Sequence, residues 1–485
     1  MMKIPNHPFW MACVNMLSFL LQKLLERCSC VLSMAETCRL IFMLERNHNI
    51  MSKTIKKIKP ETKVCKKCGR ELPLERFARS YKKYYHSVCK ECNNAAQRVE
   101  RAAKRAALRA EKEAADIEEY LKDKSLHLKR QYKKIDAWRV LSKAEHGFKL
   151  KASQEKFVKL LDYKETWVSS YGRVIIKDEN GVYQLVQGKY TGAILYYTLD
   201  QNVYFKSKKE WGYRRQKVSA SELVIQTFIV NHDMKNNTKC WHTDNNKRDN
   251  YYKHLYPVTD KQYAALVDLY RKNGTVTEAE VMKIVNAPEY KPDGWNAKYM
   301  KRSVCGVGYL AEKMPTYVYI SDAYIRWANM IQRCYSKTVQ KNKPYYKGKK
   351  VCEEWHNFQN FKIWYDMHMI PGAKVDLDKD LICKESNCYR PETCSFVSHY
   401  INTLFEDRGT KWIVEETKDG MFAASLMILK QKKKAGIYDT REAAEKAFYE
   451  YKKDHIVKIA NKSKGKIPDY VYNAMLAWNV QKQCA

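Results

Sequence analysis

Two C-x-x-C pairs near the amino-terminal end constrain this chain more than any other feature of its sequence. Cys65 and Cys68 form the first pair, Cys89 and Cys92 form the second, and twenty residues lie between the pairs. Two intervening residues let both sulfurs of a pair face one point, and four thiolates around a point suit tetrahedral zinc. Because four protein ligands leave no coordination position open, the sequence predicts a structural zinc.

Two alternatives accompany this prediction. The four thiols are either unpaired cysteines of a reducing compartment, or His86 replaces one of them as a ligand, although a surface histidine is the simpler interpretation. Gly69, Pro73 and Phe77 follow the first pair, and Arg98 follows the second. This order resembles the small zinc ribbons of phage and bacterial HNH-type proteins, and the resemblance implies a zinc ribbon over residues 51–97.

The charge balance indicates a polyanionic partner. The 485 residues include 89 Lys and Arg against 54 Asp and Glu, a net charge of +35 that is spread over almost the whole chain. Such a surface attracts nucleic acid, whose phosphates bind basic side chains. A hydrophobic share of 45% is enough to form cores and disfavours intrinsic disorder. The length predicts about three or four domains.

Residues 1–50 differ from the rest in composition, with four cysteines and apolar runs such as MLSFLLQKLL. Polar and charged residues interrupt the run before it reaches the ~20 residues of a membrane-spanning helix, which disfavours an anchor. These residues are Gln22, Lys23, Glu26 and Arg27. Met51 opens a basic, polar segment, so we interpret residues 1–50 as a non-native or disordered leader. An intact native mass that includes them would refute this.

Residues 98–150 form the next segment, which is rich in Ala, Glu, Lys and Arg and predicts one long linker helix. Its second half is acidic, and its first half has the basic residues Arg98, Arg101, Lys104, Arg105 and Arg109. The basic half is expected to lie along phosphates. The alternative is a solvated spacer helix with i,i+4 ion pairs.

Residues 151–263 contain short strand-like segments with many aromatic residues. Residues 167–174, WVSSYGRV, resemble the modular DNA-binding motif that precedes the nuclease core of phage homing endonucleases. This resemblance implies that Arg173 contacts DNA. Residues 223–228 and 242–259 resemble the HNH core itself, a ββα-metal fold in which a hairpin carries a histidine and the following helix supplies a metal ligand.

The HNH resemblance assigns roles to residues of the hairpin. Phosphodiester cleavage requires a base that activates water and a cation that stabilises charge on the phosphate. The resemblance makes His242 the general base, while Asp244, Asn246 and Asn250 shape the turn around it. Asp and Asn also favour tight turns on their own account.

The sequence departs from the HNH pattern at three positions. Trp241 replaces the usual acidic residue before the histidine, His254 replaces the middle Asn, and Tyr263 lies near the position that donates a metal ligand from the helix. A folded but inactive remnant is therefore the alternative to a working nuclease centre.

A second resemblance to phage HNH or homing-type endonucleases begins at residue 306 and includes the segments CEEWHNFQNFKIWY, VDLDKDLI and YRPETCSFVSHYIN. It implies a second HNH-like module over residues 306–407. Aromatic residues recur there at three-residue steps, which is typical of the core face of a helix. They are Trp355, Phe358, Phe361 and Trp364.

In this module the resemblance places residues 376–380 in the hairpin and Asn402 at the metal-ligand position of the following helix. Asp376, Asp378 and Asn402 offer the oxygen ligands that suit Mg²⁺ or Mn²⁺. The hairpin lacks a histidine, and His399 or His356 is the candidate substitute. A solvated hairpin without metal is the alternative.

Residues 408–460 predict three strands and a helix and resemble the plant ethylene-response-factor type of DNA-binding domain, which lays its sheet in the major groove. Trp412 and Phe422 belong to the match. The lysines expected to reach phosphates are Lys430, Lys432, Lys433 and Lys434. Residues 264–305 predict a helical connector, and residues 461–485 predict a terminal helix.

We therefore expect a multidomain α+β protein with a zinc ribbon, two HNH-like ββα modules and a C-terminal three-stranded sheet plus helix. The resemblances imply a phage HNH or homing-type endonuclease that hydrolyses double-stranded DNA with Mg²⁺ or Mn²⁺, in the cytoplasm of an infected bacterium and without membrane contact. The alternatives are an inactive DNA-binding protein of the same ancestry, and RNA binding through the ribbon and the basic helix.

Overall fold

The computed structural model describes residues 61–81, 84–122, 131–405, 413–428 and 431–478. They divide into two units, one up to Leu108 and one from Arg109 onward, which we describe separately. The proposed leader and start at Met51, as well as Trp412 and Lys430, lie outside the described residues. Among the described helices, none combines the length and the apolar character needed to cross a membrane.

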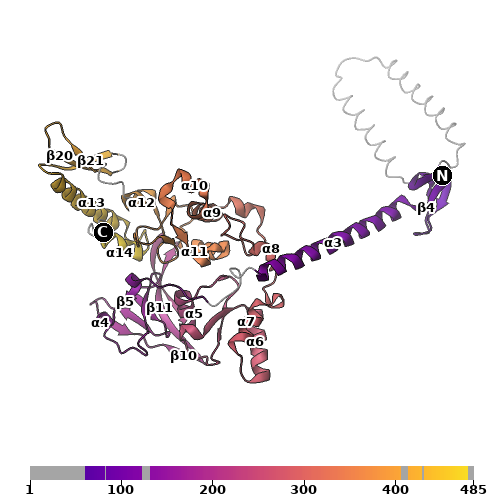
Figure 1. Ribbon diagram of the computed structural model, residues 1–485, viewed down its shortest axis with the longest axis horizontal. Coiled ribbons are helices and arrows are strands. Elements are labelled where there is room, and N and C mark those ends of the chain that lie inside the picture. Colours follow the sequence, from indigo (N-terminus) through magenta and orange to yellow (C-terminus); the bar gives the residue numbers. More distant parts are fainter. Residues whose placement is uncertain (1–60, 82–83, 123–130, 406–412, 429–430, 479–485) are drawn as a thin grey trace, which may run out of the picture. The chain divides into compact units, whose positions relative to one another are not determined.

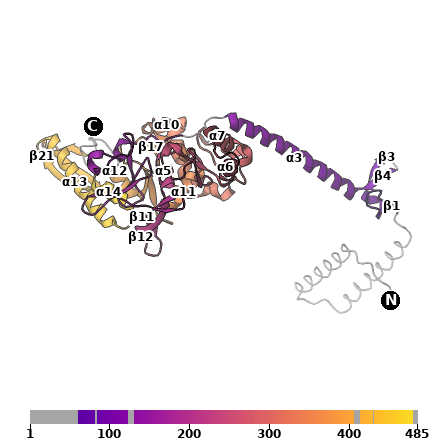
Figure 2. The ribbon, with the colours of Figure 1, turned by 90° about the horizontal axis from the view of Figure 1, so that it is seen from below.

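The first unit contains the paired cysteines, and Figures 1 and 2 show its strands next to the start of one long helix. It contains two antiparallel hairpins and the start of a helix: β1 (Thr62–Val64) with β2 (Glu71–Pro73), β3 (Phe77–Tyr81) with β4 (Tyr84–Cys89), and α3 (Lys90–Lys122). Its core is small and consists of Phe77 and the buried Cys65 and Cys89 with a few partly buried neighbours. Apolar burial therefore contributes little to the stability of this unit.

The predicted long helix is confirmed over Lys90–Lys122, but the predicted helical linker does not continue to residue 150. From residue 131 the chain forms a bridge, a short strand β5 (Val140–Leu141) and a single helical turn α4 (Lys143–His146). The reason is tertiary packing, because Ile135 and Val140 contact the core of the following sheets.

The first part of the second unit consists of two antiparallel sheets and a helix. The sheets contain β5, β6 (Phe157–Leu160), β7 (Thr166–Ser169), β8 (Val174–Lys177) and β9 (Tyr183–Leu185), and β10 (Lys189–Thr191), β11 (Ile194–Phe205) and β12 (Glu210–Ser219). Residues Val158, Val168, Tyr197 and Leu223 share one buried core, which joins both sheets to α5 (Ala220–Phe228). Leu255 of the next hairpin also belongs to this core, so the hairpin packs on it.

That hairpin consists of β13 (Lys239–His242) and β14 (Leu255–Val258), and two helices follow it, α6 (Asp260–Asn273) and α7 (Glu278–Asn286). The two helices lie side by side in Figure 1. Trp241, Tyr256 and Val258 of the hairpin share a buried cluster with Leu266 and Val281 of the helices. The segment predicted as a connector therefore packs on the hairpin.

The second hairpin module is mostly helical around short strands. Its elements are α8 (Ala297–Met300), α9 (Asp322–Tyr335), α10 (Lys337–Asn342), β15 (Lys350–Val351), α11 (Phe358–His368), β16 (Val375–Asp378), β17 (Cys388–Tyr389), β18 (Ser395–Ser398) and α12 (His399–Phe405). The predicted aromatic core face is confirmed, since Trp355, Phe358 and Phe361 are fully buried. They pack around Trp327, whose indole N–H donates to the carbonyl of Trp355 at 2.7 Å.

The C-terminal part is the predicted three-stranded sheet with a helix. Its elements are β19 (Val414–Glu416), β20 (Phe422–Ile428), β21 (Gln431–Tyr438), α13 (Arg441–Ser463) and α14 (Asp469–Leu476). In Figure 1, α13 runs along the β20–β21 sheet, and Ala444 and Phe448 share its core with Leu426. The second half of α13 and α14 pack with α12 in another cluster. The α+β class is confirmed.

Candidate functional site

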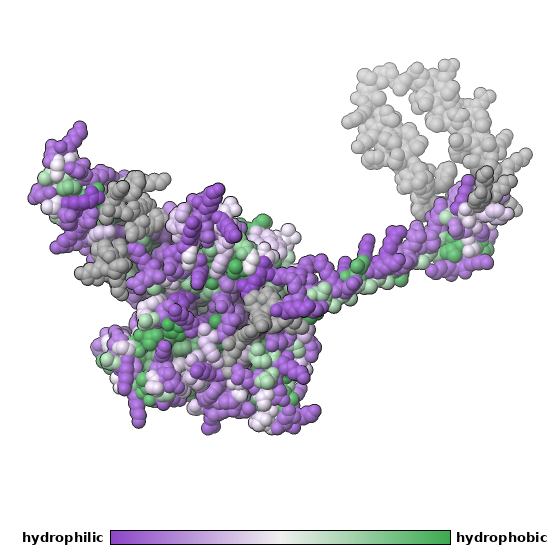
Figure 3. Space-filling model, in the orientation of Figure 1, coloured by the Kyte–Doolittle hydropathy of each residue, from purple (hydrophilic) through white to green (hydrophobic). Residues whose placement is uncertain are grey.

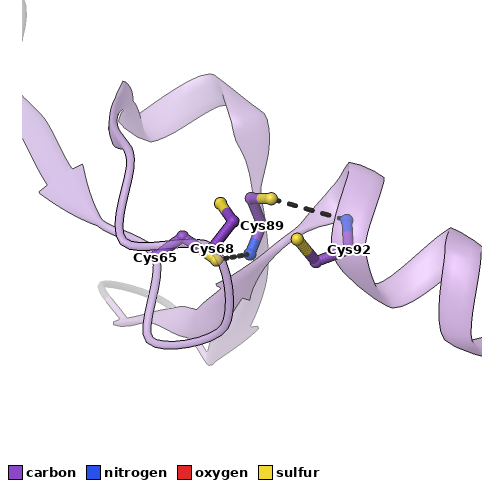
Figure 4. A group of neighbouring side chains, drawn as sticks. All are labelled: Cys65, Cys68, Cys89 and Cys92. Carbon is purple, nitrogen blue, oxygen red and sulfur yellow. Dashed lines mark hydrogen bonds between the residues drawn. The ribbon is translucent and has the colours of Figure 1, made fainter.

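The four predicted cysteines converge on one point. Cys65 and Cys68 lie in the turn between β1 and β2, Cys89 ends β4, and Cys92 lies in the first turn of α3 (Figure 4). Their sulfur atoms all lie within 4.8 Å of one another. The amide of Cys89 donates to the sulfur of Cys65 at 3.3 Å, and the amide of Cys92 points at the sulfur of Cys89 at 3.5 Å. The cluster is compatible with a zinc ribbon, and it does not include the exposed His86.

The surroundings of the first pair favour thiolates. The amide of Cys89 and neighbouring amides lower the pKa of Cys65 to about 6, and the side chain of Arg70 lowers the pKa of Cys68. A side-chain hydrogen bond with Cys89, together with burial, raises the pKa of Cys92 to about 12, because both favour the protonated thiol over the thiolate. Four sulfurs with this charge pattern fit a divalent metal that prefers thiolates.

The first hairpin places its predicted catalytic residues in different environments. His242 is only 9% exposed, and its Nε2 atom has no hydrogen-bond partner. Burial lowers its pKa, so the imidazole is neutral near pH 7. Asn246 is exposed in the turn, whereas Asn250 is buried against Gly172, where an added Cβ would lie 2.6 Å from that of Asn250. The side chain of Asn250 therefore packs closely against Gly172 in the turn between β7 and β8.

The hairpin loop also brings together a group that the sequence did not indicate. Ligand atoms of Asp244, Asp249 and His254 lie within 4.8 Å of one another. Nδ1 of His254 lies 2.7 Å from Oδ2 of Asp249 and 3.4 Å from Oδ2 of Asp244. The HNH resemblance places His254 only at the position of the middle Asn, and no local motif pairs it with these carboxylates.

An aromatic pair fills the positions of the first hairpin at which the HNH resemblance expects metal ligands. Thr259 caps α6, and Trp241 pairs with the residue three positions before this cap, while Tyr263 lies four positions after it. The rings of Trp241 and Tyr263 have centroids 5.8 Å apart at an angle of 70°. Trp241 is 6% exposed and belongs to the core shared by hairpin and helices. Neither of these two side chains offers a carboxylate or an amide oxygen.

The second hairpin has the same register. The hydroxyl of Ser398 accepts the amide of Ile401 at 3.2 Å at the start of α12, as Thr259 does at the start of α6. Counted from Ser398, Asp378 takes the place of Trp241, Lys379 takes that of His242, and Asn402 takes that of Tyr263. Lys379 is 3% exposed and donates to the carbonyl of Ser386 at 3.0 Å. The histidine position thus holds a buried lysine.

The predicted magnesium ligands of this module do not all meet. Nδ1 of His399 lies 2.7 Å from Oδ2 of Asp376, and the amide of Asn402 donates to the same oxygen at 3.1 Å. Asp378 is buried instead and accepts the amide of Leu381 at 2.8 Å, and burial raises its pKa to about 6. Among the described residues, Asp376 and Asp378 belong to no group of three or more His, Cys, Asp or Glu side chains with metal-ligand spacing.

Arg173, which the resemblance assigns to DNA contact, forms hydrogen bonds within the protein. Its guanidinium donates to both carboxylate oxygens of Glu155, at 2.9 and 2.5 Å, and to the carbonyl of Lys149 at 3.0 Å. The side chain of Glu155 is fully buried and that of Arg173 is 19% exposed. This bidentate ion pair holds the turn after β7 in place, and the guanidinium uses its Nε and one terminal nitrogen for hydrogen bonds within the protein.

Two groups of exposed lysines lie elsewhere in the second unit. Lys433 and Lys434 are exposed on β21, while Lys432 pairs with Glu415 of β19. Hydrophilic side chains gather at the end of this sheet in Figure 3. The sequence analysis missed the other group, around α10, where six lysines occur without an acidic residue between residues 336 and 350 and where Tyr345 is 66% exposed. The uniform charge of that segment was its sequence signal.

Comparisons with protein-family models, curated proteins and solved structures find no match for this chain.

Proposed function

We propose that this protein binds double-stranded DNA and hydrolyses its phosphodiester bonds with a divalent cation, as a nuclease of the phage HNH or homing type. The supporting observation is His242, a buried neutral imidazole whose Nε2 atom has no hydrogen-bond partner. It ends the first strand of a hairpin that is followed by a capped helix. A neutral imidazole is suited to accept the proton of an attacking water.

The proposed hydrolysis forms one bond, breaks one bond and transfers two protons. The water oxygen forms a bond to phosphorus, the bond from phosphorus to the leaving oxygen breaks, and Nε2 of His242 accepts the water proton. A divalent cation would stabilise the charge that develops on the phosphate. The leaving oxygen takes its proton from solvent.

The four-cysteine cluster contributes to this proposal as a structural element. We assign zinc to it, because four cysteine sulfurs within 4.8 Å of one another favour zinc over oxygen-preferring cations. The zinc would hold β1 to β4 together, so that the exposed basic half of α3 leaves the ribbon as a continuous helix. Basic side chains on this half are available to phosphates.

A second candidate function is DNA binding without cleavage. It is favoured by the packing of Trp241 on Tyr263, which occupies the usual ligand positions of the first module. It is also favoured by Lys379, whose ammonium is engaged by the carbonyl of Ser386 in the second module. A protein with two such modules would keep its DNA-binding surfaces and lose the reaction.

Cleavage assays with single histidine variants distinguish these functions. Zinc-loaded protein with Mg²⁺ or Mn²⁺ is expected to nick or break supercoiled DNA, and His242→Ala is expected to lower the rate by about 10²–10⁴-fold, the usual contribution of a general base. His399→Ala is the matched control, because His399 lies in the other module and is exposed. Loss of cleavage only in His399→Ala would move the reaction to that module. DNA binding without products would support the second candidate.

The DNA-binding part of the proposal is tested by salt. Replacing Lys433 and Lys434 together by Ala is expected to weaken DNA binding for all sequences and to reduce the slope of log affinity against log salt by about 2, since each phosphate contact contributes nearly one unit. Fluorescence anisotropy with labelled duplexes measures this slope. The control is Lys272→Ala with Lys283→Ala, which removes two exposed lysines from α6 and α7. Equal effects of the two variants would contradict a specific role for the sheet.

A further inference from the structure

We propose that Asp244, Asp249 and His254 form a divalent-cation site on the loop between β13 and β14. This site is separate from the hairpin and helix positions at which the family resemblance places a metal. The site itself is inferred from geometry, whereas its use in DNA cleavage rests on the proposed function.

The three side chains are arranged as ligands. Each carboxylate uses Oδ1 to accept a backbone amide of its own loop, that of Asn246 for Asp244 and that of Tyr251 for Asp249, at 3.1 and 2.9 Å. Each therefore has Oδ2 directed to the ring of His254, at 3.4 and 2.7 Å from Nδ1. Two carboxylate oxygens and one imidazole nitrogen converge without any change of the backbone.

The backbone holds His254 in place. The amide of Thr243 donates to the carbonyl of His254 at 2.7 Å, and the amide of His254 donates to the carbonyl of Tyr251 at 2.8 Å. The ring of Tyr251 also packs edge-on against the imidazole, with centroids 5.2 Å apart. The ligand from the end of the loop therefore stands at a fixed distance from the ligands at its start.

A second observation concerns the residue at which this loop begins. His242 directly precedes this loop, and its Nε2 atom is buried without a hydrogen-bond partner. Buried polar atoms are nearly always paired, so the unpaired imidazole nitrogen of His242 indicates a missing water or ligand near the start of this loop.

The packing of the module explains why the cation would bind here. Trp241 and Tyr263 are committed to the core below the hairpin, so a cation cannot use the helix side. The loop side is partly open, because the side chains of Asp244, Asp249 and His254 are 22, 30 and 39% exposed. Water can therefore complete the coordination shell.

The ligand set selects a class of cation. Carboxylate oxygens suit Mg²⁺ and Mn²⁺, and a neutral imidazole shifts the preference toward first-row transition metals such as Mn²⁺. Thiolates are absent from the three ligands, which separates this site chemically from the four cysteines. Mn²⁺ is therefore the probe that distinguishes the two sites within the intact chain.

Titration of the zinc-loaded full chain with Mn²⁺, with free Mn²⁺ followed by electron paramagnetic resonance, tests the proposal. We expect a bound Mn²⁺ whose spin-echo modulation shows one imidazole nitrogen. Asp244→Asn with Asp249→Asn should weaken binding at least ~10-fold. The Asn side chains keep an oxygen for the amides of Asn246 and Tyr251, so the loop can keep its fold. His254→Gln should remove the nitrogen modulation.

Two controls make the result specific. Asp178→Asn changes a turn carboxylate that accepts the amides of Asn180 and Val182 and lies in the β8–β9 turn. Asp376→Asn changes another carboxylate that pairs with a histidine. Neither should alter Mn²⁺ binding. Mn²⁺ binding that survives the double Asn variant, or that is lost in Asp376→Asn, would overturn the site. Binding at the loop without DNA cleavage would leave the site intact and refute only the nuclease proposal.

Discussion

Removing the metal from the four cysteines is expected to unfold the ribbon, the module of residues 61–92, while the second unit stays folded. Structural zinc contributes about 10–16 kcal/mol to the folding of small zinc modules at neutral pH. The ribbon has only Phe77 and a few neighbours as an apolar core, which is too small to replace this contribution. Hydrogen exchange followed by mass spectrometry should show loss of protection in β1 to β4 after chelation, and unchanged protection in β11 and β12.

A pair of serine variants provides the control for this experiment. Cys68→Ser removes one sulfur of the cluster and should reproduce the effect of chelation. Cys305→Ser changes an exposed cysteine outside the cluster and should have no effect. Unchanged exchange after chelation, or equal exchange in the two variants, would show that these cysteines do not hold a structural metal.

Replacing Glu392 by Gln is expected to destabilise the second unit by about 3–5 kcal/mol, the cost of breaking a buried charge pair. The side chain of Glu392 is 12% exposed and lies 3.8 Å from Nζ of Lys133 and 3.5 Å from a guanidinium nitrogen of Arg139. Without Glu392, the nearly buried Arg139 keeps no other ion pair among the described residues. Urea unfolding of the two proteins at pH 7 measures the difference.

The same carboxylate predicts a dependence on pH. Burial by itself raises the pKa of Glu392. The positive charges of Lys133, Arg139 and Arg390 have a larger, opposite effect, and the net result is a pKa of about 2. Because the folded-state pKa lies below the ordinary value of 4.5, the stabilisation is complete above pH 4.5 and is lost as the pH falls toward 2. The wild-type advantage over Glu392→Gln should therefore shrink in acid. Glu385→Gln changes an exposed carboxylate nearby and should match the wild type at both pH values.

Much of the secondary structure follows from local patterns. The Ala, Glu, Lys and Arg content of α3 is sufficient for a helix because propensity acts within a few residues. Aromatic residues at helical spacing predict the buried face of α11, and turns and alternation predict the sheet β19 to β21. The prediction fails for residues 131–150, where contacts with distant strands decide the conformation.

Some features of the candidate sites are likewise predictable from the sequence, and others depend on the tertiary structure. Cys65 to Cys92 are predictable because two short motifs contain all four ligands. His242 is predictable as a residue of its hairpin, but its burial and its unpaired nitrogen depend on the sheets beneath the loop. The motif position of Arg173 is the same for a DNA contact and for a structural ion pair. Only the buried Glu155 decides that Arg173 forms the ion pair.

The amino-acid sequence by itself determined the basic charge, the spacing of the cysteines and the helix and strands of segments such as α3 and β19 to β21, because these properties depend on residue type and short separations. Tertiary structure alone decided which charged groups meet. The pairing of His254 with Asp244 and Asp249, and that of His399 with Asp376, results from strand register and loop closure. These depend on the sum of many packing contacts, which no single segment of the chain contains.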